Sequence, residues 1–158
     1  MKTILILALF AITISVNAQT QTKLVAYGPS ITLEAAKKIV AAAEAFAVSK
    51  QYTVVVAIVD TGGNLVMLTK MDNTQLGSIE VAMGKAKTAN NFKRPTKAFE
   101  DVVAGGGAGL KVLGLNVVPV EGGEPIYSAD GKIIGAIGVS GMTSAQDGEV
   151  VKAALGNK

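Results

Sequence analysis

The sequence predicts an α+β sandwich, in which helices cover a mainly antiparallel sheet. One observation is an apolar stretch over residues 132–140, which follows a short first strand at residues 125–127 and a tight turn. A second is the continuous β-branched run over residues 53–59, which is followed by a Gly-Gly turn and an apolar partner segment at residues 64–71. Both patterns are typical of β-hairpins, and strands joined by hairpins run antiparallel.

The hairpin near the end of the chain is expected to lie at the centre of the sheet. Its turn is Asp130-Gly131, a pair that tolerates the positive φ angles of a tight hairpin. The return strand carries large apolar side chains on both faces, which predicts a strand that is covered on each side. Its small residues, Gly135, Ala136 and Gly138, allow either a packed helix or a ligand to approach the backbone closely.

Four segments have the pattern of helices. The first begins after Thr32, a good N-cap, and carries an apolar stripe at helical spacing. The expected helices cover residues 33–49, 75–90, 96–103 and 142–155. Residues 117–120 are predicted to form a short fifth strand, which Pro119 places at an edge or an irregularity. In the second helix, Gly77 and Gly84 are expected where the backbone passes another element.

Residues 1–18 have the pattern of a secretory signal peptide. Lys2 provides a basic start, residues 4–16 form an apolar run, and Ala18 supplies the small residue of a cleavage site. The run is too short for an ordinary membrane span. We therefore expect cleavage after Ala18, a polar lead over residues 19–30, a single domain over residues 31–158, and a periplasmic or secreted protein without a membrane span.

The composition excludes several classes of chemistry. The sequence has no Cys and no His, so it cannot use disulfides, thiolates, a Ser-His-Asp triad or histidine-ligated zinc. Removing Lys2 with the signal lowers the formal net charge from +3 to +2, and aromatic residues make up only 4% of the chain. Such a balance gives neither the basic patch nor the stacking platforms of a nucleic-acid-binding protein.

Several blocks of the chain, in the right order, resemble the GlcG/HbpS-like family, the haem-degrading domain family related to the C-terminal part of PduO-type proteins. The blocks are Asp60-Thr-Gly-Gly-Asn-Leu-Val, Met71-Asp72, Gly77-Ser-Ile-Glu-Val-Ala-Met-Gly-Lys-Ala-Lys-Thr-Ala, Arg94-Pro-Thr, Gly122-Gly-Glu-Pro-Ile, Gly135-Ala-Ile-Gly-Val-Ser-Gly and Gln146-Asp147. The resemblance implies a profilin-like three-layer fold, with a five-stranded antiparallel sheet between helices, assembled into homo-oligomers. Some members of that family bind or degrade haem, and at least one secreted member is a redox or haem sensor accessory.

The best polar constellation surrounds Arg94-Pro95-Thr96 and the polar positions of the second helix, Glu80, Lys85 and Lys87. These residues could form a cationic rim for the carboxylates of haem propionates or of a small organic acid. The alternative is a structural ion pair, for example between Arg94 and Glu80.

A second candidate site lies at one end of the central sheet. There the backbone amides of the Gly122–Pro125 segment and of Ser140-Gly141 could bind an anion. Gln146 and Asp147, near the start of the last helix, suit either capping or ligand contact. The residues predicted to bind a ligand are Arg94, Thr96, Glu80, Lys87, Gly123, Pro125 and Ser140.

Haem is the candidate cofactor, but the chain lacks the commonest iron ligand, histidine. The side chains left to bind iron are Tyr27, Tyr52, Tyr127, Met71, Met83, Met142, a lysine or Thr96. No spacing singles one of them out, and the sequence identifies no catalytic residue and no metal ligand.

Three functions stay open from the sequence. The first is a secreted, non-catalytic protein that binds haem or another tetrapyrrole. The second is a binding protein for a small organic acid, and the third is a haem-degrading enzyme. Catalysis ranks last because no nucleophile–base pair is evident.

The signal pattern generates a prediction about the mature protein. We expect the chain, expressed with its own leader in a Gram-negative host, to be exported and to begin at or next to Gln19. Mass spectrometry of the periplasmic protein measures this directly. Intact Met1 on protein recovered from the cytosol would contradict it.

Overall fold

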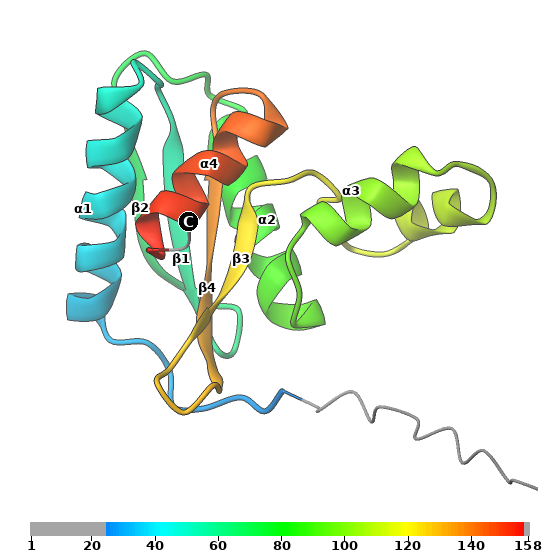
Figure 1. The fold of residues 1–158 in the computed structure, drawn as a ribbon, viewed down its shortest axis with the longest axis horizontal. Helices are drawn as coiled ribbons and strands as arrows, with labels where there is room; N and C mark the ends of the chain where they lie inside the picture. The colour runs from blue at the N-terminus through cyan, green and yellow to red at the C-terminus, as the bar shows by residue number, and fades with distance from the viewer. Residues whose placement is uncertain (1–24, 157–158) are drawn as a thin grey trace, which may run out of the picture.

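The computed structural model describes residues 25–156, so the predicted signal peptide and the first half of the polar lead, residues 19–24, lie outside the described residues. The elements follow one another as α1 (Leu33–Ser49), β1 (Val55–Asp60), β2 (Leu65–Lys70), α2 (Ser78–Phe92), α3 (Lys97–Ala104), the 3-10 helix η1 (Gly107–Gly114), β3 (Gly123–Tyr127), β4 (Ile133–Ser140) and α4 (Ser144–Ala154) (Figure 1). All four predicted helices are confirmed, and Thr32 caps α1 by accepting a hydrogen bond from the Ala35 N–H.

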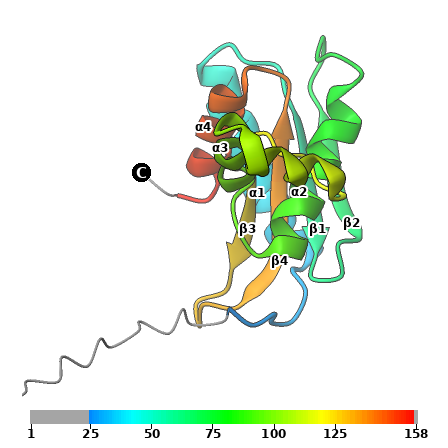
Figure 2. The ribbon, with the colours of Figure 1, turned by 90° about the vertical axis from the view of Figure 1, so that its right-hand side faces the viewer.

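The molecule has three layers, with the sheet in the middle. All neighbouring strands are antiparallel, in the order β2-β1-β4-β3, so β4 is an interior strand as predicted. Side chains alternate across β1: Val56 and Ile58 pack in the core with α1 and α4, whereas Val55 and Ala57 pack against α2. Helices α1 and α4 thus cover one face and α2 covers the other (Figure 2).

The described sheet has four strands, and the prediction of a fifth strand at residues 117–120 is wrong. Pro119 has no N–H, and the other N–H donors of the segment are bound outside any strand ladder. The Val118 N–H donates to the Thr88 hydroxyl at 2.9 Å, and the Val120 N–H turns back to the Val118 carbonyl. A segment whose donors are used in this way has none left for a ladder.

The hairpin between β3 and β4 is confirmed, but its connecting loop is one residue longer than predicted. Only Gly131 has a positive φ, at 78°, while Asp130 does not. The Gly131 N–H bonds the Ser128 carbonyl, and the Ser128 N–H bonds the Lys132 carbonyl. The loop is therefore a turn followed by a glycine bulge, which needs one left-handed residue rather than two.

Helix α2 lies unusually close to β4. A Cβ at Gly138 would overlap the Ala82 carbonyl oxygen, and Ala82, Ala86 and Ala89 are fully buried beneath the sheet. Gly138 therefore serves helix packing, one of the two interpretations expected, whereas a Cβ at Gly135 would overlap the Val59 carbonyl oxygen of the neighbouring strand. Gly84 behaves as predicted, because a Cβ there would lie 2.5 Å from Val118, whereas Gly77 faces open space and its prediction is wrong.

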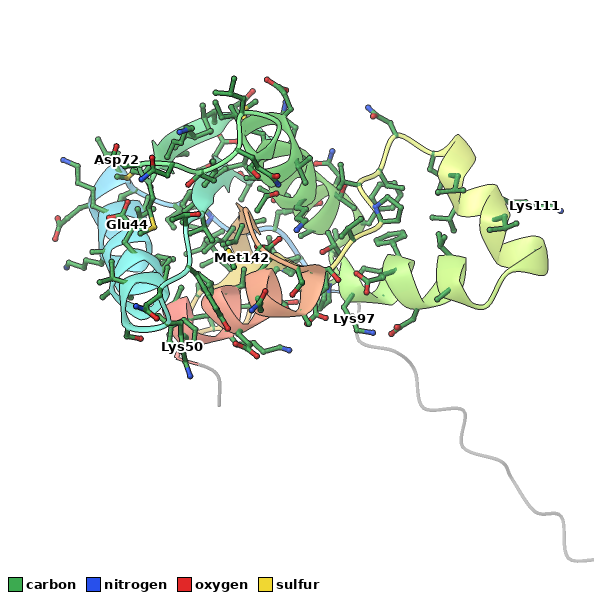
Figure 3. The ribbon with its side chains drawn as sticks, turned by 90° about the horizontal axis from the view of Figure 1, so that it is seen from above. Glu44, Lys50, Asp72, Lys97, Lys111 and Met142 are labelled. Carbon is green, nitrogen blue, oxygen red and sulfur yellow. The ribbon has the colours of Figure 1, made fainter. Side chains whose placement is uncertain are left out.

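Residues 97–120, here called the arm, project from the body of the molecule (Figure 1). Lys97 marks the base of the arm and Lys111 lies near its far end (Figure 3). Phe99 is the one buried residue of α3, and η1 has none. The exposed apolar side chains of the arm are Val102, Leu110, Leu113, Leu115 and Val120. Across residues 25–156, none of the helices is both long and apolar enough to cross a membrane.

Candidate functional site

A buried ion pair lies where α2, β4 and α4 meet. Lys85, in α2, is 1% exposed, and its Nζ donates to Asp147 Oδ2 at 2.8 Å and to the Val139 carbonyl at 2.9 Å. Asp147 is 2% exposed and its other oxygen accepts from the Met142 N–H at 3.0 Å. Burial raises the pKa of the Asp147 carboxyl above its ordinary value, and the bond from Lys85 opposes that rise.

The placement of Lys85 corrects the prediction that it lies on the polar surface of α2. It follows Ala82 by three residues and precedes Ala89 by four, so helical spacing puts it on the buried face with both. The signal was available in the sequence, but the residue type argued against it. Near Asp147, Thr143 and Gln146 form a capping box, so capping is confirmed for Gln146 while Asp147 serves the ion pair.

The Gly122-Gly123 pair is required by this ion pair and by Thr96. A Cβ at Gly122 would lie 2.9 Å from Lys85 Nζ, and one at Gly123 would lie 2.6 Å from the Lys85 carbonyl oxygen. The Gly123 N–H donates to the Thr96 hydroxyl at 2.9 Å, and the Thr96 N–H donates to the Gly123 carbonyl at the same distance. The structure thus brings Gly123 and Thr96 together, and each satisfies hydrogen-bonding groups of the other. A ligand would have to break these bonds to bind either residue.

The remaining predicted residues are spread over several surfaces. Ser140 is buried and its hydroxyl donates to Ser78 at 3.3 Å. Pro125 is buried in the edge strand β3. Glu80 and Lys87 are exposed on α2, and within residues 25–156 no ion pair joins Glu80 to Arg94 or to Lys87.

Arg94 occupies a different position from the one expected in an ion pair with Glu80. The chain turns sharply at Lys93, which has φ 55° and caps α2 by donating its N–H to the Ala89 and Asn90 carbonyls. Arg94 is exposed, its Nε donates to the Phe92 carbonyl at 3.2 Å, and its guanidinium lies 5.6 Å from the centre of the Phe99 ring. The Arg94–Glu80 pair is therefore wrong, while the ligand-binding role of Arg94 stays a prediction.

A second polar group, which the sequence did not indicate, lies between the arm, the start of β3 and α4. Glu121 accepts from Lys152 Nζ at 3.1 Å, and the Glu121 N–H donates to Glu100. Glu124, three residues further on, is half-buried. Burial raises the pKa of the Glu124 carboxyl; the Lys152 charge lowers it and the Glu121 charge raises it further. These residues come from segments far apart in the chain, so no local pattern could have grouped them.

A cavity of about 190 Å³ opens beside the outer edge of β3. Its lining consists of Glu124, Pro125, Ile126, Tyr127 and Leu155. Burial raises the pKa of the Tyr127 phenol, and the charge of Glu124 raises it further. Pro125 is thus the predicted site residue that does line a cavity.

The iron-ligand candidates differ in how available they are. Thr96 is fully buried, the Tyr27 hydroxyl donates to the Asn90 carbonyl at 2.7 Å, and the Tyr52 hydroxyl donates to Glu149 at 3.3 Å. Tyr127 is 49% exposed. The three methionines are half-buried: Met71, Met83 and Met142. Within the described range, no three acidic residues gather into a group that could hold a metal ion.

The fold and these sites define a small α+β domain with one sheet between helical layers, tied by a buried ion pair. The chain belongs to the HbpS-like family: the family model described as "Haem degrading protein HbpS-like" matches residues 31–156.

Two curated relatives support this assignment. One is an uncharacterized 15.0 kDa protein from the dhaT-dhaS intergenic region of Citrobacter freundii, 37% identical over 128 residues, covering 80% of this chain and 90% of that protein. The other is protein GlcG of Escherichia coli K12, 38% identical over 110 residues, covering 70% of this chain and 81% of GlcG.

Solved structures share the fold. The Klebsiella pneumoniae protein ORFY superposes with a TM-score of 0.76 and 31% identity, covering 82% of this chain and 90% of ORFY. A PduOC–haem complex superposes with a TM-score of 0.72 and 32% identity, covering 80% of this chain and 94% of the PduOC chain. HbpS superposes with a TM-score of 0.73 and 29% identity, covering 84% of this chain and 92% of the HbpS chain.

The buried ion pair generates a stability prediction. Lys85→Met strands the Asp147 carboxylate, so we expect a loss of about 3 kcal/mol in unfolding free energy at neutral pH. Without Lys85 the folded pKa of Asp147 rises further above its unfolded value. The variant should therefore lose stability as the pH rises from the unfolded to the folded pKa of Asp147, and the destabilisation caused by Lys85→Met should be smaller in mild acid. Urea denaturation followed by circular dichroism measures both effects.

Two further variants test the interpretation. Lys87→Met, on the exposed face of the same helix, should change stability by less than about 0.5 kcal/mol. Replacing both partners, as Lys85→Met with Asp147→Leu, should recover most of the loss. Equal effects of Lys85→Met and Lys87→Met would contradict a stabilising role for the pair.

Proposed function

We propose that this protein binds haem or a related tetrapyrrole without catalysing its breakdown, and that it does so as a periplasmic or secreted protein. Family membership and the likeness to the PduOC–haem complex support the ligand. The signal pattern of residues 1–18 supports the location.

The observation that carries this proposal is the exposed guanidinium of Arg94 at the base of the arm. Its Nε bond to the Phe92 carbonyl and its position over Phe99 hold the group in one orientation. Within residues 25–156, its two terminal nitrogens donate no hydrogen bond. A planar guanidinium fixed in this way can bind a propionate carboxylate with two parallel bonds.

The surroundings of Arg94 suit an apolar, anionic ligand. Phe92 and Phe99 meet edge to face beneath it, with ring centres 5.2 Å apart, and the exposed leucines of the arm lie further along the same projection. The cavity beside β3, at about 190 Å³, is smaller than pockets that enclose drug-sized ligands, so a macrocycle would lie on this surface instead. Bound haem would supply a redox-active iron, and the described candidates for binding it are Tyr127, the half-buried methionines and the exposed lysines.

Hemin titration tests the proposal. We expect wild-type protein to shift the Soret band saturably, and Arg94→Ala to bind about tenfold more weakly, because one charge-assisted carboxylate contact is lost. Arg94→Lys should fall between the two, since it keeps the charge but not the planar fork. Lys38→Ala, which removes an exposed cation on α1, is the matched control.

Because Arg94 is exposed, its alanine variant should unfold within about 0.5 kcal/mol of wild type. Unchanged hemin affinity in Arg94→Ala would refute this site, and absence of any saturable shift would refute haem binding. Loss of the bound Soret band after a reductant is added would point to a haem-degrading enzyme instead.

We also propose that copies of this chain assemble through the arm. Several apolar side chains of the arm are largely exposed, with Leu113 at 58%, Leu110 at 49% and Leu115 at 49%. A projection with so little core of its own leaves an apolar surface that a second copy would cover.

Light scattering tests the assembly. Wild-type protein at micromolar concentration should have a mass at least twice that of one chain, and Leu110→Glu with Leu113→Glu should lower it. Val48→Glu, an equally apolar and exposed position on α1, is the control. A wild-type mass no greater than the 16.1 kDa of a single chain would refute the proposal.

A further inference from the structure

The cavity beside β3 has a chemical character of its own, distinct from the surface around Arg94. Consecutive residues of β3 form its wall, and Leu155, just beyond the end of α4, closes it. Pro125, Ile126 and Leu155 provide apolar surface. The polar residues of the lining are Glu124 and Tyr127.

The backbone at Pro125, beside this cavity, offers an acceptor without a donor. Gly123 turns its N–H and carbonyl toward the outer edge of β3, where Thr96 binds both. Backbone groups of alternate residues face the same edge, so Pro125 faces outward as well. Pro125 has a carbonyl but no N–H, and thus adds a second acceptor near that of Glu124.

Glu124 is the negative charge in this region that is left without a partner. Lys152 is the nearby cation, and it pairs with Glu121 at 3.1 Å. No hydrogen bond or ion pair to the Glu124 carboxylate occurs within residues 25–156. A half-buried carboxylate of this kind is best satisfied by a ligand that brings both a positive charge and N–H donors.

From this geometry we propose that the cavity binds a small organic ammonium ion. The ammonium group would bind the Glu124 carboxylate, with the Pro125 carbonyl as a second acceptor, and a short alkyl body would lie against Ile126 and Leu155. A volume of about 190 Å³ corresponds to about six waters at their share of liquid volume, which limits the ligand to a few heavy atoms.

Other ligand classes fit the cavity less well. A small organic acid would place its carboxylate against Glu124, and the lining contains no cationic side chain to offset the repulsion. A metal ion would find one carboxylate where several oxygen ligands are needed. The inference does not depend on haem binding, since a tetrapyrrole is too large for this space.

The test is a titration of the 15N-labelled mature protein with n-butylammonium chloride, followed by amide NMR. We expect saturable shifts centred on the amides of Ile126, Tyr127 and Leu155. Uncharged 1-butanol should bind at least about tenfold more weakly, and butyrate should produce no saturable shift at these amides. Sodium chloride at equal ionic strength is the blank for screening.

Three variants separate charge from shape. Glu124→Gln keeps the shape and should weaken n-butylammonium binding by about tenfold or more. Glu34→Gln, which removes an exposed carboxylate on α1, should leave it unchanged. Leu155→Phe narrows the cavity without changing its charge, and it should also weaken binding.

The pH dependence gives an independent readout. Burial raises the folded pKa of Glu124, and the ammonium ion binds the ionised form, so affinity should increase as pH rises through that pKa. Glu121 and Lys152 are the other charged groups that act on Glu124, and Tyr127 is the phenol beside it. The profile of Glu124→Gln reveals any contribution from those three groups.

Equal affinity for 1-butanol and n-butylammonium would overturn the inference, because the cavity would then be merely apolar. Unchanged binding by Glu124→Gln, or equal shifts with sodium chloride, would overturn it too. Hemin titration reports on Arg94 and this experiment on Glu124, so failure of one proposal is distinguishable from failure of the other.

Discussion

The buried bond between Lys85 and Asp147 is the constraint on which the arrangement of this domain depends. Lys85 belongs to the helix on one face of the sheet and Asp147 to a helix on the other face, and the lysine also binds the carbonyl of Val139 in β4. The pair therefore connects all three layers. Because both charges are almost fully buried, any packing that separated them would leave an uncompensated charge in the core.

This constraint explains features that would otherwise suggest a ligand site. The Gly122-Gly123 pair resembles an anion-binding turn, yet its missing side chains leave room for the lysine and for Thr96. The polar groups best suited to a ligand lie elsewhere, at Arg94 and at Glu124. One is cationic and beside an exposed apolar surface, and the other is anionic and set in a small cavity. The two sites proposed there have opposite charge, so each would take a ligand of a different size and sign.

The sequence predicted most of the fold because its signals are local. The N-cap at Thr32, the β-branched run of β1 and the hairpin before β4 depend on neighbouring residues, and the structure confirms each of them. Residues 117–120 were predicted wrongly because β-branched residues favour strands, whereas here the side chain of Thr88 took the donor of Val118. Such competition comes from a residue thirty positions away.

The sites were harder to predict because they depend on tertiary burial. Lys85 was assigned to the surface by residue type although its spacing placed it among buried alanines. Arg94 was expected to reach Glu80, but the left-handed turn at Lys93 leads the chain away from α2 and onto Phe99. The segment of Glu124 was considered for its backbone amides, but its carboxylate was not singled out, since its surroundings come from β3 and the end of α4. The role of a charged residue depends on how deeply it is buried and by which residues, and both depend on the whole fold.

The two borders of the sheet differ in a way that limits growth. At β3 the outward N–H of Gly123 is bound by Thr96 and Pro125 has no N–H, so the docking of another strand there is disfavoured. At β2, the outer side has no neighbouring strand in the described part of the chain, and its central residues are consecutive apolar ones. Such a sheet can pair with a second copy only through the edge strand β2. If two copies paired through β2, both outer edges of the combined sheet would be β3 strands, so edge-to-edge growth into a fibre would stop at the dimer.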